Sequence, residues 1–288
     1  MMKDKSNTKR LFLFAGYDRD GIIDDTLVYY ASHLAKFGDI VLVMDSDCTE
    51  SELKKIKPYC RYISAVRHSE YDFGSYKRAY IWAVENVGLE NYELVYMVND
   101  SVYGPFFDMK PYFEKMESGG EYGAFGMVDK TMGHAPHIQS WFIGMRPIVF
   151  MSGWFDEFIK SVCHQPSKNR VAIMYETGFT QLLKKQNIKY FCLFYVLNRG
   201  VYKRIKSLYK RGMPFMKKVT FLALEGALGY QIRYVLKHIS NDLSMAIINN
   251  ARRVYGAEYT DKVLRNGYLI SIFTKAKHII KRIISGKI

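Results

Sequence analysis

Residues 94–106 read LVYMVNDSVYGPF. The first five residues are apolar and favour β-structure, so they predict a buried strand. This strand ends at Asn99-Asp100-Ser101, and a Gly-Pro pair then signals a turn. Ligands of open α/β sheets bind at the carboxyl ends of the strands. Asp100 therefore stands where a carboxylate can either contact a ligand or close an Asx-turn on nearby backbone N–H groups.

Similar apolar runs precede this strand and alternate with amphipathic helices. The predicted strands are 11–15, 40–44, 61–66 and 94–98, and the predicted helices are 24–37 and 75–87. Further along, the expected strands are 123–128, 138–143 and 189–196, and the expected helix is 176–186. This alternation is typical of an α/β fold with a mostly parallel sheet flanked by helices.

The positive charge of the chain is concentrated at one end. The net charge is +14, but residues 1–200 hold equal numbers of basic and acidic side chains, so the surplus lies in residues 201–288. The sequence pattern of this region predicts a largely helical structure. A neutral body with a basic C-terminal extension predicts two domains and an anionic partner for the second, either a lipid surface or nucleic acid.

The last twenty residues predict an amphipathic helix with a cationic polar face. Its apolar residues recur at steps of three and four: Leu269, Ile272, Phe273, Ala276, Ile279, Ile280, Ile283 and Ile284. Between them lie Lys275, Lys277, His278, Lys281 and Arg282. Such a helix either lies in a membrane interface or packs on the body.

No signal peptide and no run long enough to span a membrane is evident, and the four cysteines are scattered. We therefore expect a cytoplasmic protein that is peripheral on the inner face of the membrane. The tyrosines of the basic region leave a nucleic-acid-binding module as an alternative. No nucleic-acid-binding motif supports that alternative.

The stretch YDFGSYKR offers a second candidate site. Asp72 and Gly74 precede an expected helix start, and Lys77 follows in its first turn. A helix N-terminus with a nearby lysine suits an anion. The alternative is that Asp72 caps the helix and Lys77 is solvated.

The stretch HAPHIQSWF supplies a third. His134 and His137 flank a proline, and Gln139, Ser140 and Trp141 follow at an expected strand start. These side chains can line a sugar pocket by hydrogen bonding and stacking. The alternative is an exposed loop with no ligand.

The stretch YETGFTQ supplies a fourth. Glu176 is expected at a helix start, where the helix dipole favours an ionised carboxylate. That position suits a general base. It equally suits a first-turn glutamate that only stabilises its helix.

Five segments together resemble one protein family. YDFGSYKRAY, VNDSVYGPF, HIQSWFIGMR, YETGFTQLL and GMPFMKK occur in this order. They resemble the rhamnan synthesis protein F family of bacterial polysaccharide glycosyltransferases over roughly residues 10–220. The resemblance implies transfer of a sugar, often L-rhamnose from a dTDP-activated donor, onto a lipid-linked cell-surface polysaccharide acceptor. It also implies a fold similar to the A-type nucleotide-sugar glycosyltransferases, with a catalytic domain at 1–200.

The resemblance gives each candidate residue an expected role. Glu176 is the expected catalytic base, with Asp129 as the second candidate. The expected donor and nucleotide contacts are Gly16, Tyr17, Asp72, Gly74, Lys77, Asn99, Asp100 and Ser101. The expected acceptor or sugar contacts are His137, Gln139, Ser140 and Trp141.

The expected metal ligand is Asp100, holding a divalent cation, Mg²⁺ or Mn²⁺. A-type enzymes commonly carry an Asp-x-Asp motif at this place, whereas this chain has one acid, in Asn99-Asp100-Ser101. Metal dependence is therefore open, and a basic side chain can instead neutralise the leaving diphosphate. A non-catalytic scaffold with the same fold is the remaining alternative.

Overall fold

The computed structural model describes residues 8–132, 136–197 and 200–284. The chain forms two compact units, which we call the sheet unit and the C-terminal unit. The sheet unit comprises Met1–Ile23, Leu27–Asp100 and Asp108–Asn198, and the C-terminal unit comprises Asp24–Thr26, Ser101–Phe107 and Arg199–Ile288. The functions expected of the two predicted domains stay predictions.

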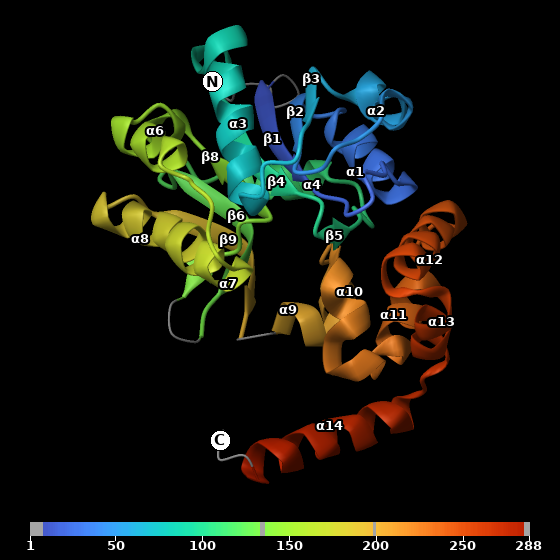
Figure 1. The fold of residues 1–288 in the computed structure, drawn as a ribbon. Helices are drawn as coiled ribbons and strands as arrows, with labels where there is room; N and C mark the ends of the chain where they lie inside the picture. Colours follow the sequence, from blue (N-terminus) through green and yellow to red (C-terminus); the bar gives the residue numbers. More distant parts are fainter. Residues whose placement is uncertain (1–7, 133–135, 198–199, 285–288) are drawn as a thin grey trace. The chain divides into compact units, whose positions relative to one another are not determined.

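The sheet unit is built on an eight-stranded sheet (Figure 1). Its strands are β1 Arg10–Gly16, β2 Asp39–Met44, β3 Tyr62–Ala65, β4 Leu94–Asn99, β6 Ala124–Lys130, β7 His137–Ile138, β8 Phe142–Met145 and β9 Tyr190–Val196. Their order is β3-β2-β1-β4-β8-β6-β7, with β9 paired to β6. The β1–β2, β1–β4, β2–β3 and β6–β9 pairs are parallel, and β7 and β8 run antiparallel to their neighbours. The predicted mostly parallel α/β sheet is confirmed.

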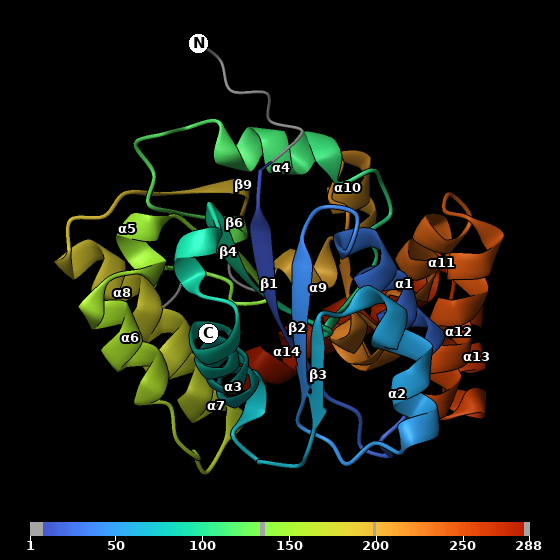
Figure 2. The ribbon, with the colours of Figure 1, turned by 90° about the horizontal axis from the view of Figure 1, so that it is seen from above.

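Helices cover both faces of this sheet. They are α1 Asp25–Leu34, α2 Glu50–Ile56, α3 Tyr71–Asn86, α4 Lys110–Glu117, α5 Pro147–Phe150, α6 Gly153–Lys160, α7 Lys168–Val171 and α8 Gly178–Lys185, with 3₁₀ turns at Lys57–Tyr59 and Leu89–Asn91. Figure 2 shows α3, α6 and α8 on one side of the strands, where their apolar side chains join the main core. On the other face, α1 and α4 pack Tyr30 on Phe14 and Phe113 on Phe12, with ring centroids 5.1 and 5.9 Å apart. This double coverage explains why the first strands are apolar at nearly every position.

One predicted strand is wrong. Residues 138–143 are not continuous, because β7 ends at Ile138, Ser140 and Trp141 form a turn, and β8 begins at Phe142. Both pieces run in the same direction, antiparallel to β6, and the turn shifts their register on β6 by two residues. Strand β8 also pairs with β4. The apolar run hid the break, since Trp141 is buried like a strand residue.

Two predicted helix starts are also wrong. The helix expected from residue 75 begins at Tyr71, so Asp72 lies in its first turn rather than in front of it. The helix expected from residue 176 is part of a helical run that begins at Lys168, where the Ser167 hydroxyl accepts the N–H of Arg170 at 3.3 Å. Both runs start in polar segments that carry no apolar periodicity.

The C-terminal unit is largely helical. Its helices are α9 Gly200–Lys203, α10 Ile205–Lys210, α11 Gly229–Leu236, α12 Asn241–Tyr255, α13 Ala257–Arg265 and α14 Tyr268–Ile284, with a 3₁₀ segment at Lys218–Gly226. Strands β5 Val102–Tyr103 and β10 Met216–Lys217 pair in a small sheet. Buried Phe221, Ile232, Ile247 and Val263 form part of its core.

Helix α14 carries exposed apolar side chains. Leu269, Ile272, Phe273, Ile280, Ile283 and Ile284 are each at least 45% exposed. Among the described residues, no helix is long and apolar enough to cross a membrane.

Candidate active site at the carboxyl edge of the sheet

Several predicted residues lie at the carboxyl ends of neighbouring strands. Gly16 ends β1, Asn99 ends β4, and Asp129 is the next-to-last residue of β6. The β1–β4 pairing continues past the strand end, because the N–H of Asp100 donates to the carbonyl of Ala15 at 3.1 Å. The sheet therefore gathers these residues at the edge where open α/β sheets bind ligands.

Asp72 lies against the end of β4. The side-chain amide of the buried Asn99 donates to Oδ2 of Asp72 at 3.0 Å. Asp72 stands in the first turn of α3, where the helix dipole stabilises a carboxylate. A hydrogen bond to a charged group contributes about 1.5–3 kcal/mol, so this contact fixes both side chains.

Tyr76 connects α3 to the 140–141 turn. Its ring is fully buried, and its hydroxyl donates to the carbonyl of Ser140 at 3.0 Å. Burial and then the Asp72 charge raise the pKa of Tyr76 well above its ordinary value, so the hydroxyl remains a neutral donor. Tyr76 was not predicted from the sequence, although it lies one helical turn after Asp72 and so on the same face of α3.

Glu176 holds the same turn from the other side. Its Oε1 accepts both the backbone N–H and the hydroxyl of Ser140, at 2.7 and 2.9 Å. Its Oε2 lies 3.4 Å from Nε2 of His137, and the other ring nitrogen of His137 lies 3.4 Å from Thr177 Oγ1. His134, the other predicted histidine, lies outside the described residues.

The predicted helix-start position of Glu176 is wrong. Glu176 lies in a π-helical segment, Ala172–Thr177, between α7 and α8. Single π-helical turns inside helices occur frequently at functional sites. The dipole at a helix start therefore does not account for the position of Glu176, whereas Ser140 supplies two hydrogen-bond donors to its carboxylate.

Gln139 and Trp141 stabilise the turn. The indole N–H of Trp141 donates to Oε1 of Gln139 at 2.8 Å, and the carbonyl of Trp141 accepts the N–H of Asn99 at 3.2 Å. Both side chains are buried, Trp141 to 2% exposure. This burial leaves little of the indole for a sugar to stack on, and the sugar contact of both residues stays a prediction.

Asp129 is the second predicted base. Its side chain is buried, and within the described part of the chain its Oδ1 has no hydrogen-bond partner. Burial raises the pKa of Asp129, and the charges of His137 and Lys184 oppose that shift. A carboxyl group with a raised pKa is closer to the value that suits a general base at neutral pH.

The remaining donor candidates differ in their exposure. Tyr17 is 50% exposed, and the Arg67 guanidinium lies 5.3 Å from the centre of its ring. Lys77 lies in the second turn of α3, not the first, and its ammonium contacts Glu70 at 2.7 Å and the Val162 carbonyl at 2.5 Å. These contacts occupy part of the lysine's donor capacity, and its contact with the donor stays a prediction.

Polar residues after β2 extend the same edge. Oδ1 of Asp45 accepts the backbone N–H groups of His68 and Ser69 at 2.7 and 2.8 Å. Ser46 exchanges hydrogen bonds with the backbone of Asp18, at 2.7 and 2.8 Å. These residues were not predicted from the sequence, although the polar run directly after β2 was the available signal.

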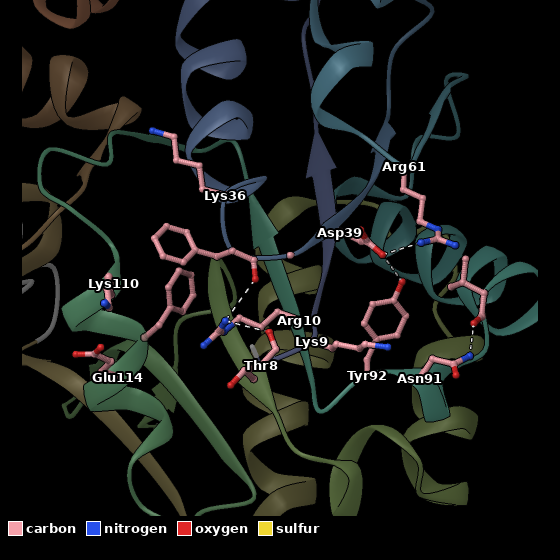
Figure 3. A pocket seen from close by; sticks show the side chains of 14 residues that line it. Thr8, Lys9, Arg10, Lys36, Asp39, Arg61, Asn91, Tyr92, Lys110 and Glu114 are labelled. Carbon is pink, nitrogen blue, oxygen red and sulfur yellow. Dashed lines mark hydrogen bonds and ion pairs between the residues drawn. The ribbon is translucent and has the colours of Figure 1, made fainter. Parts of the chain in front are cut away.

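The close-up in Figure 3 shows a pocket of about 690 Å³ at the opposite edge. Its lining includes Arg10 and Asp39, the first residues of β1 and β2. Oδ2 of Asp39 accepts hydrogen bonds from Arg61 at 2.8 Å and from the Tyr92 hydroxyl at 2.7 Å. No predicted site residue lines this pocket.

Comparison with known proteins identifies the family. The family described as rhamnan synthesis protein F matches residues 40–282, most of the chain. The chain belongs to the rhamnan synthesis protein F family. The resemblance inferred from the five sequence segments is thus confirmed, and membership supports a glycosyltransferase. No curated protein sequence matches the chain.

Solved structures similar to this rhamnan synthesis protein F member are distant. A mannosyltransferase from Pyrobaculum calidifontis, in complex with GDP-Man and Mn²⁺, is 11% identical with a TM-score of 0.40, covering 94% of this chain and 87% of that one. A mannosyltransferase from S. cerevisiae is 7% identical with a TM-score of 0.34, covering 60% of this chain and 63% of that one. A glycosyltransferase involved in glycosylation of the major capsid of PBCV-1 is 11% identical with a TM-score of 0.38, covering 73% and 93%. At such scores we draw nothing about activity from these structures.

The residues of this family member offer limited support for a bound metal ion. Within residues 8–132, 136–197 and 200–284, no group of three or more His, Cys, Asp or Glu side chains is arranged to hold a metal ion. Asp100 is a single carboxylate after β4, and Asp72 nearby accepts a hydrogen bond from Asn99. A cation at Asp100 would need most of its ligands from phosphate and water. The divalent cation stays a prediction, and we derive no step through it.

Proposed function

We propose that this protein transfers L-rhamnose from a dTDP-activated donor to a lipid-linked cell-surface polysaccharide acceptor. Membership of the rhamnan synthesis protein F family supports the reaction class. The observation that supports the site is one hydrogen-bonded network, which runs from Asp72 through Asn99 and Tyr76 to Ser140 and Glu176. The network joins four separate segments at the ligand-binding edge of the sheet.

The donor nucleotide would lie over the ends of β1 and β4. Gly16 ends β1 at this edge, where a Cβ would lie 2.2 Å from the Met44 sulfur, so the glycine makes room for Met44. The Asp72 carboxylate would accept hydrogen bonds from the base or ribose. The hydrogen bond from Asn99 holds Asp72 in place for that contact.

Glu176 is the base that we favour for an inverting transfer. The acceptor hydroxyl attacks the anomeric carbon, the bond from that carbon to the donor phosphate breaks, and the nucleoside diphosphate leaves with the electron pair. The hydroxyl proton passes to a carboxylate. The Glu176 side chain is 20% exposed, so a substrate can reach it, and Ser140 fixes its orientation. Asp129 is the alternative base because burial raises its pKa.

Helix α14 would hold the enzyme at an anionic membrane, where a lipid-linked acceptor resides. Its side chains Leu269 and Phe273 are 68% and 72% exposed, and the basic surplus of the chain lies in the same region. Each basic residue near an anionic surface contributes about 1 kcal/mol. The protein would then be cytoplasmic and peripheral on the inner face of the membrane.

The membrane role is tested with the full chain carrying Leu269→Ser and Phe273→Ser together. We expect at least about a tenfold loss of binding to phosphatidylglycerol vesicles, because burying each large apolar side chain contributes about 1.5–3 kcal/mol. Ile148→Ser, at a 66% exposed position of the sheet unit, is the matched control and should leave flotation unchanged. Equal flotation of the double variant and the control would contradict the membrane role.

A transfer assay tests the enzymatic function. The purified protein is incubated with dTDP-rhamnose, a UDP-sugar or a GDP-sugar and with a lipid-linked glycan acceptor, and the released nucleoside diphosphate is measured. We expect release with dTDP-rhamnose only, and a higher melting temperature with dTDP. If no donor reacts and no nucleotide raises the melting temperature, the protein is a scaffold. If only an oligonucleotide raises it, the protein is a nucleic-acid-binding module.

A further inference from the structure

The amino-edge pocket of Figure 3 has no role in the proposed reaction. Its volume of about 690 Å³ lies within the range of roughly 300–1,000 Å³ that is typical of small-molecule sites. All of its lining residues belong to the sheet unit, so one compact unit forms the whole pocket. They come from the starts of β1 and β2, from the segments before β2, β3 and β4, and from α4. The pocket is therefore a candidate binding site of its own.

Basic side chains outnumber acidic ones in the lining of this pocket. Five lining residues are basic: Lys9, Arg10, Lys36, Arg61 and Lys110. Two are acidic, Asp39 and Glu114. A generally basic surface does not explain this surplus, because residues 1–200 hold equal numbers of basic and acidic side chains. A cleft lined by one sign of charge raises the local concentration of oppositely charged ligands, so the pocket favours an anion.

Two of the five cations are neutralised by the protein itself. The Arg10 guanidinium donates two hydrogen bonds to Glu117, each 2.7 Å long. Arg61 donates to Oδ2 of Asp39 at 2.8 Å. These two ion pairs hold the starts of β1 and β2 in place, and they leave the three lysines as the cations that a ligand can use.

The three lysines of the pocket have no protein partner. In the part of the chain that the structure describes, the ammonium groups of Lys9, Lys36 and Lys110 make no hydrogen bond or ion pair, and all three residues are exposed. Glu114 is the only acidic lining residue outside an ion pair among the same described residues. Positive charge therefore remains in excess in the pocket.

The positions of these lysines indicate the class of anion. In the view of Figure 3, Lys36 and Lys110 lie on one side of the pocket and Arg61 lies on the other, with Lys9 between them. Cations spread in this way favour a ligand that carries more than one anionic group. A lysine ammonium binds phosphate as a compact charge with three N–H donors. A ligand with several phosphate groups therefore matches the pocket in both charge and hydrogen bonding.

We propose that the amino-edge pocket binds a ligand with several phosphate groups through Lys9, Lys36 and Lys110, and that this ligand is not the sugar donor. Two sources share this chemistry: a free polyphosphate, and a phosphodiester chain of a cell-surface polymer. The inference does not rest on the proposed function, because the pocket shares no residue with the candidate active site. It gives the large pocket a binding role and leaves the chemistry at the carboxyl edge.

Calorimetry with inorganic tripolyphosphate tests this site, with the full chain at physiological salt and without divalent cations. Lys36→Gln and Lys110→Gln together remove two of the three free cations. We expect this double variant to bind tripolyphosphate about 10–100-fold more weakly, because charge-assisted hydrogen bonds to phosphate are lost. Lys9→Gln alone should weaken that binding by a smaller factor. The affinity of both variants for dTDP should be unchanged.

Lys54→Gln and Lys57→Gln together are the matched control. Lys54 lies in α2 and Lys57 in the 3₁₀ turn that follows, and both are exposed and outside the pocket. This control removes the same amount of charge from the same unit, and it should bind tripolyphosphate as the unaltered protein does. Melting temperatures establish that each variant is folded, and exposed lysines are unlike core residues in that their loss leaves folding intact.

A glycerol phosphate oligomer distinguishes the two sources of phosphate. If the unaltered protein binds this oligomer more tightly than tripolyphosphate, the site is one for a phosphodiester chain. Tighter binding of tripolyphosphate assigns the site to a free polyphosphate. In either case the affinity should fall in the variant that lacks Lys36 and Lys110.

Four results would overturn the inference. The first is that the unaltered protein binds neither tripolyphosphate nor the glycerol phosphate oligomer. The second is an equal loss of binding in the Lys54 and Lys57 control, because the effect would then be one of general charge. The third is that citrate, an anion without phosphate, binds as tightly as tripolyphosphate. The fourth is a parallel loss of dTDP affinity in the variant that lacks Lys36 and Lys110, because the nucleotide would then occupy this pocket.

Discussion

Two glutamates, one at each edge of the same sheet, differ in what surrounds them. Glu117, at the amino edge, receives Nε and Nη2 of Arg10 at 2.7 Å each and the Tyr96 hydroxyl at 2.6 Å, and its side chain is 5% exposed. Glu176, at the carboxyl edge, receives two hydrogen bonds from Ser140, and its side chain is 20% exposed. Both are held by several donors. A substrate can reach only the second.

The difference separates a structural carboxylate from a candidate catalytic one. Burial and then the Glu117 charge raise the pKa of Tyr96 well above its ordinary value, so the Tyr96 hydroxyl stays a neutral donor to Glu117. The large pocket lies at the amino edge beside that closed cluster. The volume of this pocket therefore favours the amino edge as the ligand site. The accessible carboxylate side chains and the direction of the parallel strands favour the carboxyl edge. We place the chemistry at the carboxyl edge, because reaction requires a carboxylate that can accept a proton.

The largest expected effect is at Glu176. Glu176→Gln keeps an oxygen for Ser140 but removes the base, so transfer should fall about 10²–10⁴-fold while dTDP affinity is unchanged. The control is Glu114→Gln, an exposed glutamate that lines the amino-edge pocket, and it should transfer normally. Normal turnover in Glu176→Gln would remove Glu176 from the mechanism and leave Asp129 as the candidate.

At the amino edge the effect should be on stability instead. Glu117→Gln leaves the buried Arg10 without its carboxylate, which should lower the free energy of unfolding by about 3 kcal/mol. Urea unfolding measures that loss, and calorimetry of the folded variant should give an unchanged dTDP affinity. A variant with normal stability but weakened dTDP binding would reverse the comparison.

A smaller change is expected at Asp72. Asp72→Asn should weaken dTDP binding about tenfold, because the base or ribose loses a charged acceptor. Asp156→Asn is the matched control, since Asp156 also lies in the first turn of a helix, α6, and is not a predicted site residue. Calorimetry at one pH compares the dTDP affinities of the two variants. Equal affinities in both variants would remove Asp72 from the donor site.

The smallest effect concerns pH and Asp129. Burial raises the pKa of Asp129 above its ordinary 3.8, so the folded protein is most favoured when this group is protonated. Stability from this group is full below pH 3.8 and is lost as the pH rises through the raised pKa. Asp129→Asn does not ionise, so it should melt a few degrees higher than the unaltered protein at neutral pH. This gain in melting temperature should vanish in acid. A gain that persists in acid would contradict the raised pKa of Asp129 as its cause.

Much of the sheet could be predicted from the sequence, because its strands are apolar and short. The helix boundaries near the site could not. Tyr71 begins α3 with a φ of +60°, and no hydrophobic pattern marks such a start. The π-helical segment around Glu176 has no sequence signature either. Glu176 was therefore predicted as a site residue, but its position in a π-helical segment was not.

The site itself could be predicted only as separate segments. Asp72, Asn99 and Glu176 were singled out as strand-end or helix-end acids and amides, and the structure brings them into one network. Tyr76 links them, and from the sequence alone its aromatic ring predicts only a core position.

A crystal structure of the protein with dTDP tests the central claim most directly. We expect nucleotide density at the carboxyl ends of β1 and β4, with the base or ribose at Asp72 and the diphosphate at Asn99-Asp100-Ser101. Density in the amino-edge pocket beside Arg10 and Asp39, with none at the carboxyl edge, would contradict it.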